Sequence, residues 1–225
     1  MHRLKFIVLA IVAALAIIVV AAASASAALP EWRTGGGKPL TVPIAFEASS
    51  PEGTLETDNG NKVTCKSDTA AGKAEGEKTA SHVTVKFAGC KGPFGEACGV
   101  KGEIPSALLS GELVYLNAAQ TKVGLELNQN AITKEFANFD CGFSGKVKVT
   151  GNVIGEVTPP GTEVEKGKLI YQQTAGEQKW HTIEEKAEPP DITSYTEIFG
   201  VTSESALASE DTVTWLPAGT KVGVV

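Results

Sequence analysis

The residues best suited to chemistry in this sequence are four cysteines, Cys65, Cys90, Cys98 and Cys141. An even number of cysteines in an exported chain is typical of disulfide bonds, and four cysteines allow three pairings. Zinc binding is the alternative, but the four include no C-x-x-C pair and have no histidine at ligand spacing. We therefore expect two disulfides. We prefer Cys90 with Cys98, which closes a local loop, and Cys65 with Cys141, which joins distant strands.

Two further patterns resemble catalytic motifs, and both are incomplete. His181 with Glu184 and Glu185 gives H-x-x-E-E, which lacks the second histidine of a zinc-protease signature. The segment 142–145 (GFSG) resembles a nucleophile elbow, but Lys146 stands where the last glycine belongs. We assign no catalytic residue, no metal ligand and no cofactor from the sequence.

The 26 acidic residues keep one enzymatic alternative open. Glycoside hydrolysis needs two facing carboxyl groups, and among so many acids the sequence singles out no pair. The alternative to a protein without catalysis is therefore a secreted hydrolase of polysaccharide whose acidic pair the sequence does not identify.

The first 27 residues have the three parts of a secretory signal peptide. Arg3 and Lys5 precede an apolar run from Phe6 to Ala23, and residues 25–27 (ASA) form an A-x-A cleavage site. We expect cleavage after residue 27 and secretion of the rest of the chain. The apolar run is also about as long as a membrane-spanning helix, so an uncleaved anchor in the membrane is the alternative.

Loss of this segment would make an acidic chain more acidic. Removing two of the 20 basic residues leaves 18 against 26 acidic ones, a formal charge of −8. Nucleic acids and anionic lipids recruit Lys and Arg, so we expect neither as a partner. The expected partner is an extracellular or cell-envelope ligand of a chemistry that the composition does not indicate.

After the signal peptide, residues 28–44 contain three consecutive glycines and no periodicity, which favours a flexible lead-in. Within it, Trp32 is a candidate to pack over one end of the fold. No second linker interrupts the remainder, so we expect a single all-β domain over residues 45–225.

Short strands with period-two alternation fill this domain. Hairpins are predicted at residues 53–67, 111–127 and 167–183, where turn residues separate alternating runs. Residues 69–80 are polar and weakly patterned, which favours a loop or an edge strand, and residues 203–210 (SESALASE) resemble a helical turn. Many short strands without alternating helices predict an antiparallel β-sandwich or barrel.

The loop between Cys90 and Cys98 carries the one candidate contact residue, Phe94, which stands between Pro93 and Gly95. A strand over residues 82–88 leads into this loop. The ring either packs back onto the sheet, which is the interpretation that we prefer, or stands in water as an apolar contact for a partner.

The order of several motifs carries a resemblance: G-T-L…V-T-C at 53–65, V-x-F-x-G-C at 85–90, G-E-L-x-Y at 111–115, V-G-L-x-L at 123–127 and V-x-G-x-V-I-G at 149–155. In these motifs the chain resembles a group of uncharacterised exported all-β proteins that soil actinobacteria encode in several copies per genome. The resemblance spans nearly the whole chain after the signal peptide. It implies an exported all-β domain and carries no function.

Together these observations predict a secreted, disulfide-bonded β-domain that binds or builds something at the cell envelope or outside the cell. Catalysis is not part of this interpretation, and the polysaccharide hydrolase is its alternative.

Overall fold

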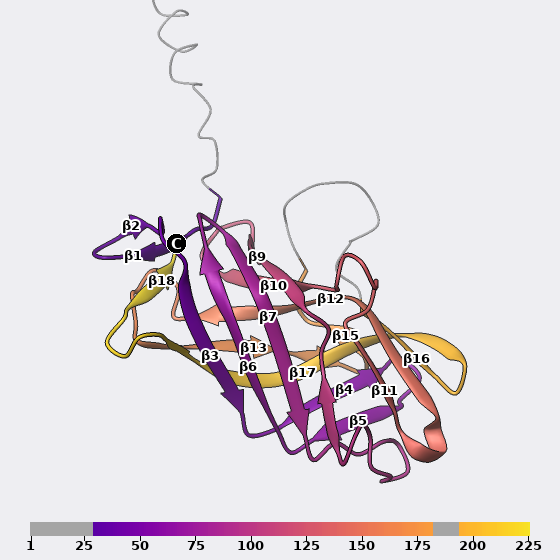
Figure 1. The fold of residues 1–225 in the computed structure, drawn as a ribbon. Coiled ribbons are helices and arrows are strands. Elements are labelled where there is room, and N and C mark those ends of the chain that lie inside the picture. The colour runs from indigo at the N-terminus through magenta and orange to yellow at the C-terminus, as the bar shows by residue number, and fades with distance from the viewer. Residues whose placement is uncertain (1–28, 182–193) are drawn as a thin grey trace, which may run out of the picture.

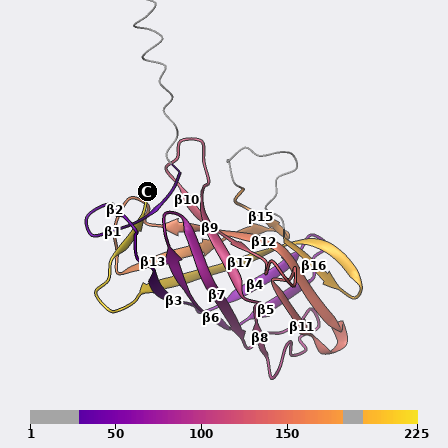
Figure 2. The same ribbon diagram turned by 45° about the horizontal axis from the view of Figure 1, so that its top comes forward.

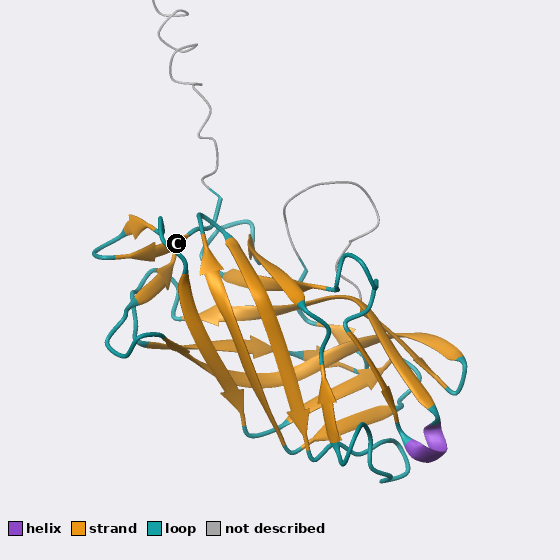
Figure 3. Ribbon diagram, viewed as in Figure 1, coloured by secondary structure: helices purple, strands orange, loops and turns teal. Residues whose placement is uncertain are grey.

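The computed structural model describes residues 29–181 and 194–225 (Figure 1). The predicted signal peptide lies outside the described residues. Apart from one 3-10 turn, η1 (Gly142–Ser144), the regular elements of the described chain are strands (Figure 3). They are β1 (Trp32–Thr34), β2 (Lys38–Pro39), β3 (Ile44–Ser50), β4 (Gly53–Thr57), β5 (Lys62–Cys65), β6 (Ser67–Glu75), β7 (Thr79–Ala88), β8 (Glu103–Pro105), β9 (Leu109–Tyr115), β10 (Val123–Asn128), β11 (Ala137–Asp140), β12 (Lys146–Thr158), β13 (Lys166–Tyr171), β14 (Gln173–Thr174), β15 (Glu177–Gln178), β16 (Ser194–Ile198), β17 (Val201–Trp215) and β18 (Val222–Val224).

Eight of these strands close into an antiparallel barrel. In chain order, β3, β6, β7, β9, β10, β12, β13 and β17 each pair with the next, and β17 pairs back onto β3. Figures 1 and 2 show β3, β6 and β7 running side by side across the front of this ring. Closure leaves these strands without a free edge along their paired stretches. The predicted all-β class is confirmed, and this half of the molecule is the barrel rather than the sandwich.

Two long strands carry the fold beyond the barrel. The first parts of β12 and β17 pair with β16 instead of with their own neighbours in the barrel. In addition, β11 pairs with β12, and β4 pairs with β17. The result is a second sheet in the order β11-β12-β16-β17-β4-β5, whose two outer strands are β11 and β5. A cross-link that closes this second sheet would have to join its two outer strands, β11 and β5.

The opposite end of the barrel is covered by a small sheet in the order β18-β1-β2. The Trp32 ring of β1 is buried and packs edge-on against Trp215, which in turn contacts Phe46. In Figure 1 the C-terminus lies beside this sheet. The segment 28–44, expected to be a flexible lead-in, thus holds two strands, and the burial of Trp32 accounts for them because an apolar ring of this size gains roughly 2–3 kcal/mol on leaving water.

Apolar and polar residues alternate along the barrel strands, so the apolar core lies inside the barrel. Inward residues of β9 and β10, such as Leu113, Val123 and Leu125, are buried, while Glu112 and Glu126 on the other face are not fully buried. The hairpin predicted at residues 111–127 is confirmed as β9 and β10, and that at 53–67 is confirmed as β4 and β5. The third, predicted at 167–183, forms only in part: β14 and β15 pair across the turn, while β13 pairs with β12 and β17 instead, and residues 182 and 183 lie outside the described residues.

Two local predictions were wrong, and both fell on strands whose inward residues are small or polar. Residues 203–210 form part of the continuous β17, and residues 69–75 belong to β6, an internal strand between β3 and β7. In β17 the buried Ser205 hydroxyl bonds with the hydroxyls of Ser194 and Thr196 on β16. Hydroxyl pairs can replace apolar contacts between strands, and such strands lack the apolar alternation that sequence reading depends on.

Candidate functional site

The disulfides join different cysteines from those that we preferred. Cys65 on β5 bonds to Cys90, and Cys98 bonds to Cys141 at the end of β11. The expectation of two disulfides is confirmed, and the expected pairs Cys90–Cys98 and Cys65–Cys141 were wrong. Sequence proximity misled because Cys90 and Cys98 face different strands, one at each outer edge of the second sheet.

The loop between Cys90 and Cys98 therefore acts as a strap between those two edges. Lys91 and Thr64 of β5 exchange both backbone hydrogen bonds at 2.9 Å, and the Gly99 N–H donates to the Asp140 carbonyl of β11 at 2.6 Å. Within the strap, the Cys98 N–H donates to the Cys90 carbonyl at 3.0 Å. Two covalent bonds and a set of backbone hydrogen bonds hold this loop, so side chains on it are carried by a rigid support.

Glu96 fixes the strap internally and to the neighbouring 3-10 turn. Its carboxylate accepts hydrogen bonds from the Phe94 backbone N–H at 2.9 Å and from the Ser144 hydroxyl. Partial burial raises the pKa of Glu96, but the hydrogen bonds from Ser144 and from backbone N–H groups together outweigh burial and lower it. A carboxylate that stays ionised at neutral pH and accepts several hydrogen bonds here links the strap to η1.

Phe94 stands out from the strap into solvent. Its side chain is 72% exposed, so the packed arrangement that we preferred is not the one adopted. The ring lies beside that of Phe199, which is 47% exposed, at a centroid distance of 5.8 Å. Phe143, on the turn that Glu96 holds through Ser144, is 91% exposed. We call Phe94, Phe143 and Phe199 the aromatic end of the molecule.

The backbone of Phe199 adds a second unusual feature. Phe199 and Gly200 form the two-residue turn between β16 and β17, with φ angles of 55° and 73°. Two successive positive φ angles define the hairpin turn in which Asn-Gly is favoured, and a bulky residue there is disfavoured. The turn thus places a strained phenylalanine beside Phe94, an arrangement more often found at functional sites than elsewhere.

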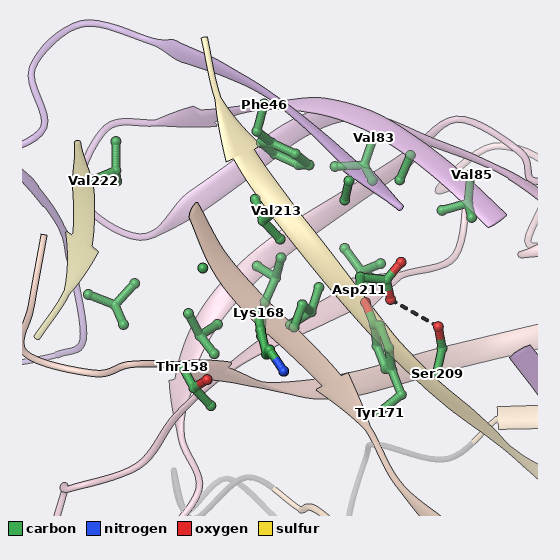
Figure 4. A pocket seen from close by; sticks show the side chains of 18 of the residues that line it. Phe46, Val83, Val85, Thr158, Lys168, Tyr171, Ser209, Asp211, Val213 and Val222 are labelled. Carbon is green, nitrogen blue, oxygen red and sulfur yellow. Dashed lines mark hydrogen bonds between the residues drawn. The ribbon is translucent and has the colours of Figure 1, made fainter. Parts of the chain in front are cut away.

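The barrel interior contains a polar cluster that sequence reading missed. Asp211 and Ser209 on β17 face Asp68 on β6 and Tyr171 on β13, and all four are buried. The Ser209 hydroxyl lies 3.1 Å from Asp211 Oδ2 and 3.2 Å from Asp68 Oδ2, so it bridges the two carboxyl groups. Figure 4 shows Ser209 and Asp211 next to Tyr171. A signal existed, because Asp211 alternates with Val213 and Trp215 and so occupies an inward position.

Burial is the largest cause of the shifted pKa values in this cluster. Loss of solvent, first, and the neighbouring carboxyl group of Asp68 together raise the pKa of Asp211 to about 8. Burial and the two carboxyl groups also raise the pKa of the Tyr171 hydroxyl. At neutral pH the pair therefore retains a proton between its two carboxyl groups.

A cavity of about 60 Å³ adjoins the cluster, with apolar walls that include Phe46, Val83 and Val213 (Figure 4). This volume is far below that of a pocket for a sugar ring, which would need several hundred Å³. In this structure the cavity therefore has no room for a sugar ring beside Asp68 and Asp211.

The catalytic-like patterns of the sequence do not form sites in the described residues. Ser144 of the GFSG segment lies on η1, is buried, and donates its hydroxyl to Glu96. His181 is exposed, while Glu184 and Glu185 lie outside the described residues. Over residues 29–181 and 194–225, His, Cys, Asp and Glu form no group of three that could hold a metal ion.

Comparison with protein-family models, with curated proteins and with solved structures found no match to this chain. In the part of the chain that the structure describes, no helix has the length and apolar character needed to cross a membrane. The fold and site define an antiparallel β-barrel protein with two disulfides, a pattern typical of proteins outside the cytoplasm.

Proposed function

We propose that this protein is a secreted, non-catalytic binding domain whose aromatic end contacts an uncharged polysaccharide of the cell envelope. The observation that supports this proposal is the exposed pair Phe94 and Phe199, carried on a disulfide-anchored strap and a strained turn. Rigid apolar rings at a surface offer contact area at little cost in conformational entropy. An acidic chain also favours an uncharged partner over an anionic one.

The polysaccharide hydrolase is the second candidate, and one experiment separates the two. The full chain, expressed with its N-terminal segment and purified without reductant, is incubated with insoluble cell-wall polysaccharide. We expect the protein to sediment with the polysaccharide and the supernatant to contain no newly released reducing sugar. Release of reducing sugar would favour the hydrolase, and protein that remains in the supernatant would contradict the proposed function.

Replacement of Phe94 tests which surface makes the contact. We expect Phe94→Ala to lose at least tenfold in affinity for the polysaccharide, because an aromatic residue central to an interface contributes about 2 kcal/mol or more. Its stability should fall by no more than the ring contact with Phe199 contributes, about 0.5–1.5 kcal/mol, since the ring is otherwise 72% exposed. Ile132→Ala is the matched control, because Ile132 is 91% exposed on another loop. Equal loss of affinity in both variants would contradict the assignment.

Replacement of Phe199 separates binding from stability. Asn suits a positive φ angle before Gly200, so Phe199→Asn relieves about 1–2 kcal/mol of backbone strain. It also loses the ring contact with Phe94, worth about 0.5–1.5 kcal/mol. We expect urea unfolding to give a stability within about 1 kcal/mol of the wild type, and sedimentation to show weaker retention on the polysaccharide. Undiminished retention would remove Phe199 from the contact surface.

A further inference from the structure

The barrel interior combines a cavity with a buried acceptor that lacks a partner. Asp68 is 2% exposed, and while its Oδ2 atom lies 3.2 Å from the Ser209 hydroxyl, its Oδ1 atom is buried without a hydrogen-bond partner in the structure. The Nε1 atom of Trp215, on the wall of the same cavity, is likewise buried and unpartnered. An unpaired buried polar group is costly, and its presence beside a cavity indicates that a guest completes its bonding.

The charge of the cluster indicates which kind of guest. Two carboxyl groups that share one proton carry one negative charge, and a buried charge needs a counter-charge. Among the described ion pairs none involves Asp68 or Asp211. Lys168 lies on the cavity wall, but its ammonium group pairs with Glu210 and its side chain is 53% exposed. The described side chains thus leave the charge of the pair unbalanced.

The walls and the size of the cavity restrict the guest further. The rings of Phe46, Tyr171 and Trp215 line it, and aromatic faces attract cations. About 60 Å³ corresponds to roughly two water molecules of free space, so the guest has very few heavy atoms. The cavity lining also includes Thr158, which is partly exposed, and Pro159 and Lys168, which are exposed, so its wall reaches the molecular surface.

We propose that the barrel interior binds one short primary ammonium ion, whose N–H groups donate to Asp68 Oδ1 and whose charge balances the Asp68–Asp211 pair. The ammonium group supplies the donor that the free acceptor lacks, and its carbon atoms occupy the apolar part of the cavity. Neutral water would satisfy the acceptor without balancing the charge. This site is separate from the aromatic end and does not depend on the proposed function.

The test measures thermal unfolding of the full chain at pH 7 with methylammonium chloride, against tetramethylammonium chloride and sodium chloride at the same ionic strength. Tetramethylammonium carries the charge without an N–H group and is too large for the cavity. We expect methylammonium to raise Tm saturably, by about 3–6 °C at tenfold excess over Kd, and the other two salts to leave Tm unchanged. Equal shifts with all three salts, or no shift with methylammonium, would overturn the proposal and leave water as the guest.

Two variants locate the effect. Asp68→Asn removes the charge and should abolish the response to methylammonium, while Glu197→Gln, on an exposed position of β16, should retain it. A retained response in Asp68→Asn would place methylammonium elsewhere. If Asp68→Asn does not fold, nuclear Overhauser effects from the methyl group of methylammonium to the ring protons of wild-type Tyr171 decide the matter, and their absence contradicts the site.

Discussion

Replacing Cys98 and Cys141 together with alanine should destabilise the protein by about 4 kcal/mol, and replacing Cys65 and Cys90 by about 3.5 kcal/mol. These values follow from the entropy that each cross-link removes from the unfolded chain, with loops of 43 and 25 residues. Alanine is the better replacement because all four positions are buried, where a serine hydroxyl would need a partner. Domains of this kind have total stabilities of about 5–15 kcal/mol, so either loss is a large fraction.

Urea unfolding of the two double variants measures these changes, and peptide mapping without reductant checks the pairing. The fold gives a further expectation, because both bonds hold the strap between β5 and β11. Each double variant should therefore also lose retention on polysaccharide, since Phe94 then sits on a looser loop. Stability losses below about 1 kcal/mol, well short of the chain-entropy values, would show that the backbone bonds of the strap suffice.

Raising the pH from 5 to 8 should lower the stability of the wild-type protein, by up to about 1.4 kcal/mol per pH unit. The pKa of Asp211 is raised in the folded state to about 8, chiefly by burial and then by Asp68. At pH values above the ordinary pKa of an aspartate, the folded state therefore binds more protons than the unfolded chain. The stabilisation that comes from this proton binding is fully present below that ordinary pKa. It is lost as the pH rises through the pKa of about 8, and the loss then levels off.

Among the described residues, few titratable groups face the Asp68–Asp211 pair. Asp211 faces Asp68 from β6 and Tyr171 from β13, and the neighbouring residues of β3 and β4 are Ser50 and Gly53. We expect Asp211→Asn to flatten the dependence and to be more stable than the wild type at pH 8, since a neutral amide replaces a group that must ionise there. Glu197→Gln should keep the wild-type slope. A slope that persists in Asp211→Asn would assign it to other groups.

Acids with a lowered pKa do not interfere in this range. Hydrogen bonds, first from Gln173, lower the pKa of Glu56, and the Gly37 and Gly36 backbone N–H groups lower that of Glu163. A lowered acid contributes stability above its unfolded pKa, which is lost only as the pH falls. The contributions of Glu56 and Glu163 are therefore constant between pH 5 and pH 8.

Sequence reading succeeded where a strand buries one apolar face. The hairpins of β9 with β10 and β4 with β5 were predicted because apolar alternation and turn residues lie within the same few residues. It was wrong at β17, where Ser205 is buried and hydroxyl pairs replace apolar contacts. Strand identity there depends on a partner strand, which the local pattern does not contain.

Within the candidate site, sequence reading singled out Phe94 as a possible contact residue, although it preferred a packed ring, and it did not single out Phe199. Phe199 is more than a hundred residues away along the chain, and only the pairing of β16 with β17 places its turn beside the strap. The preference for a packed Phe94 was wrong because it assumed a small loop closed by Cys90 and Cys98. The strap instead spans two strands and holds its middle away from the sheet.

By itself the sequence determined the all-β class, the presence of two disulfides and several hairpins, since these depend on alternation, cysteine number and turn residues that are local or countable. Only the tertiary structure decided the closure of the barrel, the partners of the four cysteines and the meeting of Asp68 with Asp211. These features join residues that are far apart along the chain. Their free energy comes from burial and pairing that exist only once the strands have found their neighbours.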